Sequence, residues 1–344
     1  MPTALAPRPL RPPRLGMALV LALALVATAC GSSDGPATAP YRSPAGEGGT
    51  TAGSEAQLNA LVASYELVAD RPQRFLLGLI DNQQRGAAYG TVELSFAYGG
   101  TSDRPLGRPR PGPTATAGFR PIPGQAADPA RTGPALVNPS EVIGVYGAEG
   151  VSLDAVGFWQ VTATVELEGG PVEASASFEV IESPVVPAVG DPAPRTRQRL
   201  AGDPGVAARA VDSRAGPEPG GPVPDPELHS TTVADALAAG RPTMVVVSTP
   251  TYCQSRFCGP ITDAVSALAA RHGDRMDFVH LEVWEDFDTQ TLNPAAPEWI
   301  FPPGSDGANE PWVFVVDGSG TIVERFDNVA TEAELARAAD EVLG

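Results

Sequence analysis

The chain has 344 residues, of which 42% are hydrophobic, enough to support two packed domains of ordinary size. It carries a formal net charge of -18 and contains no lysine, so a polyanion such as nucleic acid would be repelled. Glycine and proline contribute 37 residues each, and both concentrate in turns and linkers. The composition therefore predicts two cores joined by loose segments, with no nucleic acid among the partners.

Residues 1–29 have the pattern of an export signal. Three arginines precede the apolar stretch Met17 to Ala29, which is too short to span a bilayer at about 1.5 Å per residue. The letters ATAC, ending at Cys30, resemble a lipobox, although Ala27 departs from its usual large aliphatic residue. The lipobox predicts a lipid anchor on Cys30 at the extracytoplasmic face of the cell membrane. An ordinary signal peptide with an incidental Cys30 is the alternative, and both place the chain where thiols tend to be oxidised.

A β-rich region is predicted to follow a short tether. Residues 30–53 are small and polar, which favours a flexible segment. From residue 54 to residue 182 apolar residues recur with a period of two, as half-buried antiparallel strands require. The pattern is clearest in TVELSFAY, FWQVTATVEL and VEASASFEV, and the turn 168–171 joins the last two. The region resembles an immunoglobulin-like (Ig-like) sandwich, although no cysteine pair bridges its sheets.

Two proline-rich stretches interrupt this order. The stretch from Gly99 to Pro139 is too long for a hairpin and is predicted to be a loosely ordered insertion. Residues 183–227 contain prolines at a density that forbids a helix or a central strand, so they predict an interdomain linker. A second domain would then begin at residue 228.

Residues 228–344 alternate between helix and strand patterns. Continuous apolar runs predict strands that are covered on both faces, and stripes of apolar residues at helical spacing predict amphipathic helices. The expected elements in chain order are a helix at 232–240, a strand at 244–249, a helix after residue 260, a strand at 276–284, a hairpin at 311–326 and a C-terminal helix after residue 331.

Both remaining cysteines lie in TPTYCQSRFCGP, residues 249–260, between the first of these strands and the following helix. This placement and the order of elements resemble the thioredoxin fold, with Tyr252-Cys253 where that family has Trp-Cys. Glu310-Pro311 falls just before the hairpin, where the family has its cis-proline. The resemblance predicts two domains, an all-β Ig-like sandwich at 54–182 followed by an α/β thioredoxin-like fold at 228–344.

The resemblance also implies roles for single residues. Cys253 would be the nucleophile, and Cys258 the resolving thiol that releases the client from the mixed disulfide. The N-terminus of the helix and Arg256 would both favour the thiolate. A client peptide would lie against an edge formed by Tyr252, Glu310, Pro311 and Trp312.

Departures from that family leave alternatives open. The spacing is C-x4-C rather than C-x2-C, and positions that far apart on an ideal helix would point about 140° away from each other. Cys258-Gly259-Pro260 also matches the family's Cys-Gly-Pro-Cys, and in that register Cys258 is the thiol at the helix N-terminus. The buried acid that many thioredoxins use as proton acceptor is Val247 here, which leaves Glu282 or His280 for that task.

The main functional hypothesis is a membrane-anchored thiol–disulfide oxidoreductase. It would act through Cys253 and Cys258 on thiols or disulfides of exported proteins, or with a membrane redox partner, and would need neither metal nor cofactor. One alternative is a static disulfide in a non-catalytic scaffold lipoprotein, although so short a loop would stabilise the fold by only on the order of 2 kcal/mol. Another is Cu(I) binding by both cysteines and His280, similar to the copper-delivering SCO family.

Overall fold

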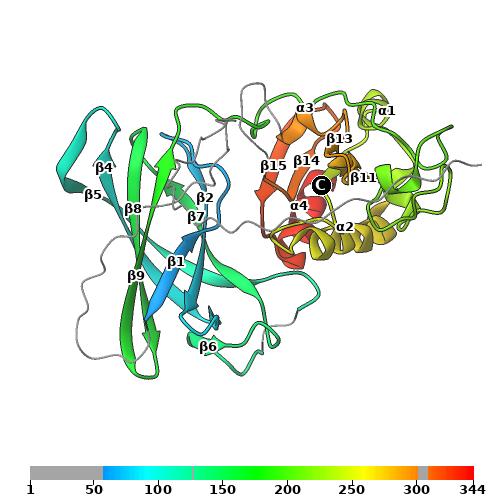
Figure 1. Cartoon of the computed structure of the whole chain (residues 1–344). Helices are drawn as coiled ribbons and strands as arrows, with labels where there is room; N and C mark the ends of the chain where they lie inside the picture. Colours follow the sequence, from blue (N-terminus) through cyan, green and yellow to red (C-terminus); the bar gives the residue numbers. More distant parts are fainter. Residues whose placement is uncertain (1–56, 126–127, 301–308) are drawn as a thin grey trace, which may run out of the picture. The chain divides into compact units, whose positions relative to one another are not determined.

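The structure is a computed structural model that describes residues 57–125, 128–300 and 309–344 (Figure 1). The predicted export signal 1–29, the tether 30–53 and the lipid site Cys30 lie outside the described residues. Within the described ranges, no helix is both long and apolar enough to cross a membrane.

Residues 58–180 form one continuous antiparallel sheet in the order β6-β3-β2-β7-β5-β4-β8-β9, with β1 paired to β2. The rings of Phe75 and Phe178 meet at 5.3 Å in its core, which strands from both ends of the sheet share. The sheet is therefore folded over on itself. Its strands are β1 (Leu58–Val62), β2 (Pro72–Asp81), β3 (Gly86–Ala88), β4 (Thr91–Gly100), β5 (Pro105–Pro121), β6 (Ala135–Val137), β7 (Gly144–Ser152), β8 (Gly157–Leu167) and β9 (Gly170–Val180).

Strand β5 occupies much of the stretch that was expected to be a loosely ordered insertion, so that expectation is wrong. Residues 105–118 pair with β4 on one side, whereas β7 pairs only with residues 118–121 on the other. Most of β5 is thus an edge strand. Proline lacks an N–H group, and an edge tolerates it where that group would have faced solvent.

A second, four-stranded sheet has the order β11-β10-β14-β15, and Figure 1 shows helices α2 and α4 beside it. Strand β10 is buried along its whole length, as its continuous apolar run predicts. The elements of this part are η1 (Ala208–Ala210), η2 (Pro226–His229), α1 (Val233–Ala238), β10 (Thr243–Ser248), α2 (Cys258–His272), β11 (Asp277–Glu282), β12 (Trp284–Asp286), β13 (Thr291–Leu292), α3 (Pro297–Ile300), β14 (Trp312–Val316), β15 (Ile322–Asp327) and α4 (Glu332–Leu343).

Alternate residues of β10 face two different cores. Met244 and Val246 pack with α2 and α4 on one face of the sheet. Val245 and Val247 pack with α1 and α3 on the other face. Side chains alternate across a strand, so a strand between two helical layers must be apolar at every position. This double cover holds β10 rigidly, and the cysteine loop starts where β10 ends.

The fold class expected from the sequence is wrong. The structure is mostly β-sheet, with 41% strand and 16% helix, and its sheets are largely antiparallel. Of the strand pairs in the described residues, only β10 and β11 run parallel. No clear thioredoxin-like α/β domain is shown there, whereas an Ig-like sandwich is compatible in part with the first sheet. The expectation rested on motifs around the cysteines, and such local motifs do not determine strand direction or the share of the chain that forms sheet.

Residues 183–227, expected to be a linker, lie against the second sheet over part of their length. Val186 and Ala193 belong to the core that contains α1 and α3. Further along, Ala208, Ala210 and Val211 are buried around η1. The prolines exclude long regular elements, but isolated apolar residues between them still find buried positions. The segment therefore contributes side chains to the fold.

Candidate redox site at Cys253 and Cys258

The two cysteines form a disulfide, with their Cα atoms 6.0 Å apart. Cys253 lies in the loop after β10, and Cys258 is the first residue of α2. Because only one of them is helical, the rotation expected along an ideal helix does not separate the sulfurs. Arg256 supplies the turn, with a φ of 66° in the left-handed region that few non-glycine residues adopt. The C-x4-C spacing is thus met by a loop that turns before the helix begins.

The two sulfurs differ in accessibility. Cys258 is completely buried, whereas Cys253 is half-buried in the loop. The N-cap residue Phe257 makes no side-chain hydrogen bond to the first turn of α2. Free N–H groups at a helix N-terminus stabilise negative charge, so a thiolate on Cys258 would be favoured there. The disulfide therefore joins a partly exposed cysteine to a buried one.

Glu310 is the acid beside the sulfurs. One of its carboxylate oxygens and the Sγ atoms of Cys253 and Cys258 all lie within 4.8 Å of one another. Burial, together with the charge of Glu282, raises the pKa of Glu310 to about 7. The following peptide bond, Glu310–Pro311, is cis, and Pro311 is buried. A carboxyl group with a pKa near 7 can both accept and donate a proton under physiological conditions.

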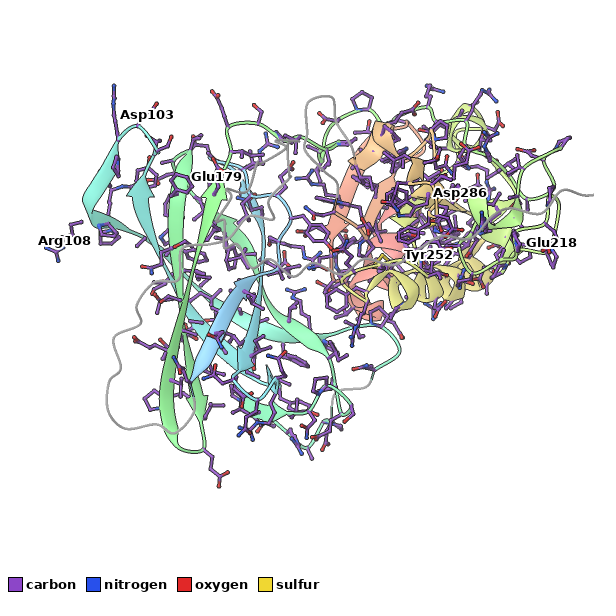
Figure 2. The ribbon with its side chains drawn as sticks, viewed as in Figure 1. Asp103, Arg108, Glu179, Glu218, Tyr252 and Asp286 are labelled. Atoms are coloured by element: carbon purple, nitrogen blue, oxygen red, sulfur yellow. A yellow bond between two sulfur atoms is a disulfide. The ribbon has the colours of Figure 1, made fainter. Side chains whose placement is uncertain are left out.

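The other predicted site residues, Tyr252, Arg256 and Trp312, differ in their exposure and packing. The ring of Tyr252, which is labelled in Figure 2, stacks on that of Phe287, with centroids 4.0 Å apart. Arg256 is exposed. Trp312 is only 3% exposed and packs in the sheet core, so its side chain is not available to a client.

Three contacts near the disulfide were not predicted from the sequence. Ser255 Oγ lies 3.3 Å from Cys253 Sγ. The hydroxyl of Tyr65 donates a hydrogen bond of 2.6 Å to the carbonyl oxygen of Glu310. Glu310 itself was named only as part of a peptide-binding edge. The pattern Cys-x-Ser offers a weak signal for Ser255, but no local motif connects Tyr65 or the Glu310 carboxylate to residues so distant in the chain.

Glu282 and His280, which were considered from the sequence as proton acceptors, contact other residues. The carboxylate of Glu282 accepts hydrogen bonds from the backbone N–H groups of Ser213 at 2.8 Å and Val283 at 2.9 Å. Burial raises the pKa of Glu282. His280 belongs to a separate buried group with Asp212 and His229. The carboxylate that lies close to both sulfurs is that of Glu310.

Comparisons with known proteins identify no family. No protein-family model matches the chain, and no curated protein matches it. Among solved structures it is similar to the sporulation control protein Spo0M from Bacillus subtilis, at 14% identity and a TM-score of 0.22, over 38% of this chain and 50% of that one. It is also similar to BslA, a bacterial hydrophobin, at 16% identity and a TM-score of 0.18, over 38% of this chain and 98% of that one. The chain thus spans half the length of Spo0M, and likenesses this weak carry no argument about function.

Proposed function

We propose that the chain catalyses thiol–disulfide exchange with exported proteins through Cys253 and Cys258. The observation that carries the proposal is the asymmetric disulfide, with Cys253 half-buried, Cys258 buried at the start of α2, and a carboxyl group of pKa about 7 beside both sulfurs. A purely structural bridge needs neither an accessible sulfur nor a neighbouring titratable acid.

Client oxidation would proceed in two displacements. A client thiolate attacks Cys253 Sγ, the Cys253–Cys258 bond breaks, and Cys258 leaves as a thiolate at the helix N-terminus. A second client thiolate then attacks the client sulfur of the mixed disulfide, which forms the client disulfide and releases Cys253 as a thiolate. The client loses two electrons and the chain gains them. In the reverse direction Cys253 attacks the client disulfide and releases one client thiolate. Cys258 then gives its thiol proton to Glu310 and attacks Cys253 Sγ, which re-forms the bridge and releases the second client thiolate.

Reversible opening of the bridge tests this activity. The full chain with Cys30→Ser has no other thiols, so alkylation and mass spectrometry count Cys253 and Cys258 alone. In a series of glutathione buffers we expect the pair to open and close reversibly at a potential above about -300 mV, the level below which structural disulfides typically lie. A pair that stays closed in every buffer would leave only the scaffold alternative.

Attachment to the membrane through lipid on Cys30 belongs to the same proposal. The lipobox-like residues before Cys30 and the apolar stretch 17–29 support it. In fractionated cells we expect wild-type chain to sediment with membranes and Cys30→Ser to shift largely to the soluble fraction. Equal sedimentation of the two, with no lipid mass on the wild-type chain, would refute the anchor without affecting the redox site.

A further inference from the structure

A second polar group, away from the disulfide, brings together two of the three histidines of the chain. Asp212 is 0% exposed, and His229 and His280 are each 2% exposed. They come from three separate segments, because Asp212 follows η1, His229 ends η2 and His280 lies in β11. Such deeply buried ionisable side chains are costly unless they are paired or bind an ion.

Two imidazole nitrogens point at the same carboxylate oxygen. His229 Nε2 lies 3.4 Å from Asp212 Oδ2, and His280 Nδ1 lies 3.6 Å from that oxygen. Both nitrogens are buried and neither has a hydrogen-bond partner in the part of the chain that the structure describes. Asp212 Oδ2 itself accepts a hydrogen bond from Arg214 Nη2 at 2.7 Å, so the carboxylate is paired while the two nitrogens are not. Nearly all buried polar atoms are satisfied, so the two nitrogens indicate a missing partner.

The second ring nitrogen of His280, Nε2, lies at hydrogen-bonding distance from Ser248, and metal-binding histidines almost always use their second nitrogen in this way. This nitrogen lies 3.2 Å from the carbonyl oxygen of Ser248 and 3.0 Å from Ser248 Oγ. A carbonyl can only accept, so the tautomer that carries its proton on Nε2 makes this bond and leaves the lone pair of Nδ1 toward Asp212.

The separations fit a tetrahedral ion. Ligand atoms about 2.0 to 2.1 Å from zinc at tetrahedral angles lie about 3.3 to 3.5 Å apart. The two distances measured to Asp212 Oδ2, 3.4 Å and 3.6 Å, are close to this edge length.

The local charge also favours a divalent cation. Arg214 forms ion pairs with Asp212 and Asp225 at 2.7 Å and with Asp263 at 2.9 Å. Three carboxylates around one guanidinium leave two negative charges that Arg214 does not compensate. A doubly charged ion between Asp212 and the histidines would neutralise them.

We propose that Asp212, His229 and His280 supply three ligands of a zinc site. Two imidazoles and one carboxylate suit zinc, whereas calcium and magnesium prefer an all-oxygen shell and Cu(I) prefers sulfur. The ion would fasten the segment around Asp212 to β11. The next residue, Ser213, accepts a hydrogen bond from the backbone N–H of Thr251 at 3.1 Å, so the fastened segment also supports the start of the cysteine loop.

Metal analysis of the oxidised full chain tests the proposal. The intact disulfide withholds both of its sulfurs, and alkylation blocks Cys30. After incubation with zinc and dialysis against metal-free buffer, we expect about one zinc per chain. His229→Ala should weaken zinc binding at least about 100-fold, while His272→Ala, which removes the histidine outside the group, should bind as the wild type does.

X-ray absorption of the zinc-loaded wild-type chain is a second readout that needs no variant. We expect two imidazole ligands and no sulfur in the first shell, whether or not His229→Ala folds. Failure of the wild-type chain to retain zinc, a sulfur-containing shell, or equal binding by a folded His229→Ala would each overturn the zinc site. Because the thiols are blocked throughout, none of these results depends on the proposed exchange activity.

Discussion

Cys258→Ser is expected to lower the rate of client disulfide reduction by about 1000-fold or more, and to leave the client attached to Cys253. Cys253 is half-buried and reachable, so its thiolate can still attack a client disulfide. No second sulfur is then left to resolve the mixed disulfide. Turnover of a fluorescent peptide with one disulfide measures the loss, and mass spectrometry of the unreduced chain detects the adduct.

Cys253→Ser is the matched partner of this variant, because Cys258 is completely buried and cannot reach a client. We expect the same loss of turnover but no adduct. Either substitution removes a bridge that stabilises the fold by about 2 kcal/mol, so unfolding curves must show that both variants remain folded. Cys258→Ala removes the sulfur without burying a hydroxyl group. A defect that Cys258→Ala and Cys258→Ser share therefore comes from the missing sulfur. An adduct on Cys253→Ser would assign the attacking role to Cys258 instead.

Strand positions with one buried face could be predicted residue by residue. In β8 the period of two places Trp159 inward and Phe158 outward, and the structure gives them exposures of 1% and 37%. The two-residue connection at 168–169 between β8 and β9 also follows the sequence. These predictions succeed because side-chain alternation is a local property of the backbone.

Properties that depend on distant partners were not predictable in this way. The Gly/Pro-rich stretch that contains β5 was predicted to be a loosely ordered insertion, and its prolines are accommodated in a strand because β7 pairs with only one end of it. The fold class was inferred from element order around Cys253, but most of the described structure is sheet and most of its strand pairs are antiparallel. Pairing is settled by long-range packing, which a local motif does not encode.

The candidate site shows the same division between local and distant information. Cys253 and Cys258 are five residues apart, so the sequence suggested them as a pair, but the turn at Arg256 that brings their sulfurs together was not predicted. The Glu310 carboxylate reaches them from the segment before β14, and its pKa is shifted by burial that only the folded chain produces. Asp212 was assigned to a linker, and its meeting with His229 and His280 joins three remote segments.

Replacing Glu310 with glutamine is expected to slow resolution of the mixed disulfide by about 100-fold above neutral pH, because the Cys258 thiol loses its proton acceptor. The direction of the pH dependence follows from the pKa of Glu310, which burial raises to about 7. Above that value the carboxylate is ionised and can accept a proton; below it the group is already protonated. The wild-type chain and Glu310→Gln should therefore differ most just above pH 7, where the carboxylate is ionised and a thiol still keeps its proton, and converge at about pH 5.5.

Quenched-flow alkylation of the mixed disulfide across this pH range measures the resolution step directly. Glu179→Gln, an exposed position on β9 (Figure 2), removes one negative charge far from any role in proton transfer and should follow the wild-type profile.

The substitution Glu310→Gln also changes the stability of the fold. A carboxyl group whose pKa is raised on folding stabilises the fold below its unfolded pKa and loses that contribution as the pH rises toward 7. Glu310→Gln should thus be more stable than the wild type above neutral pH, and its slower exchange would not come from unfolding. A resolution rate that is unchanged just above pH 7 would remove Glu310 from the proton path and leave the exchange proposal to the cysteine variants.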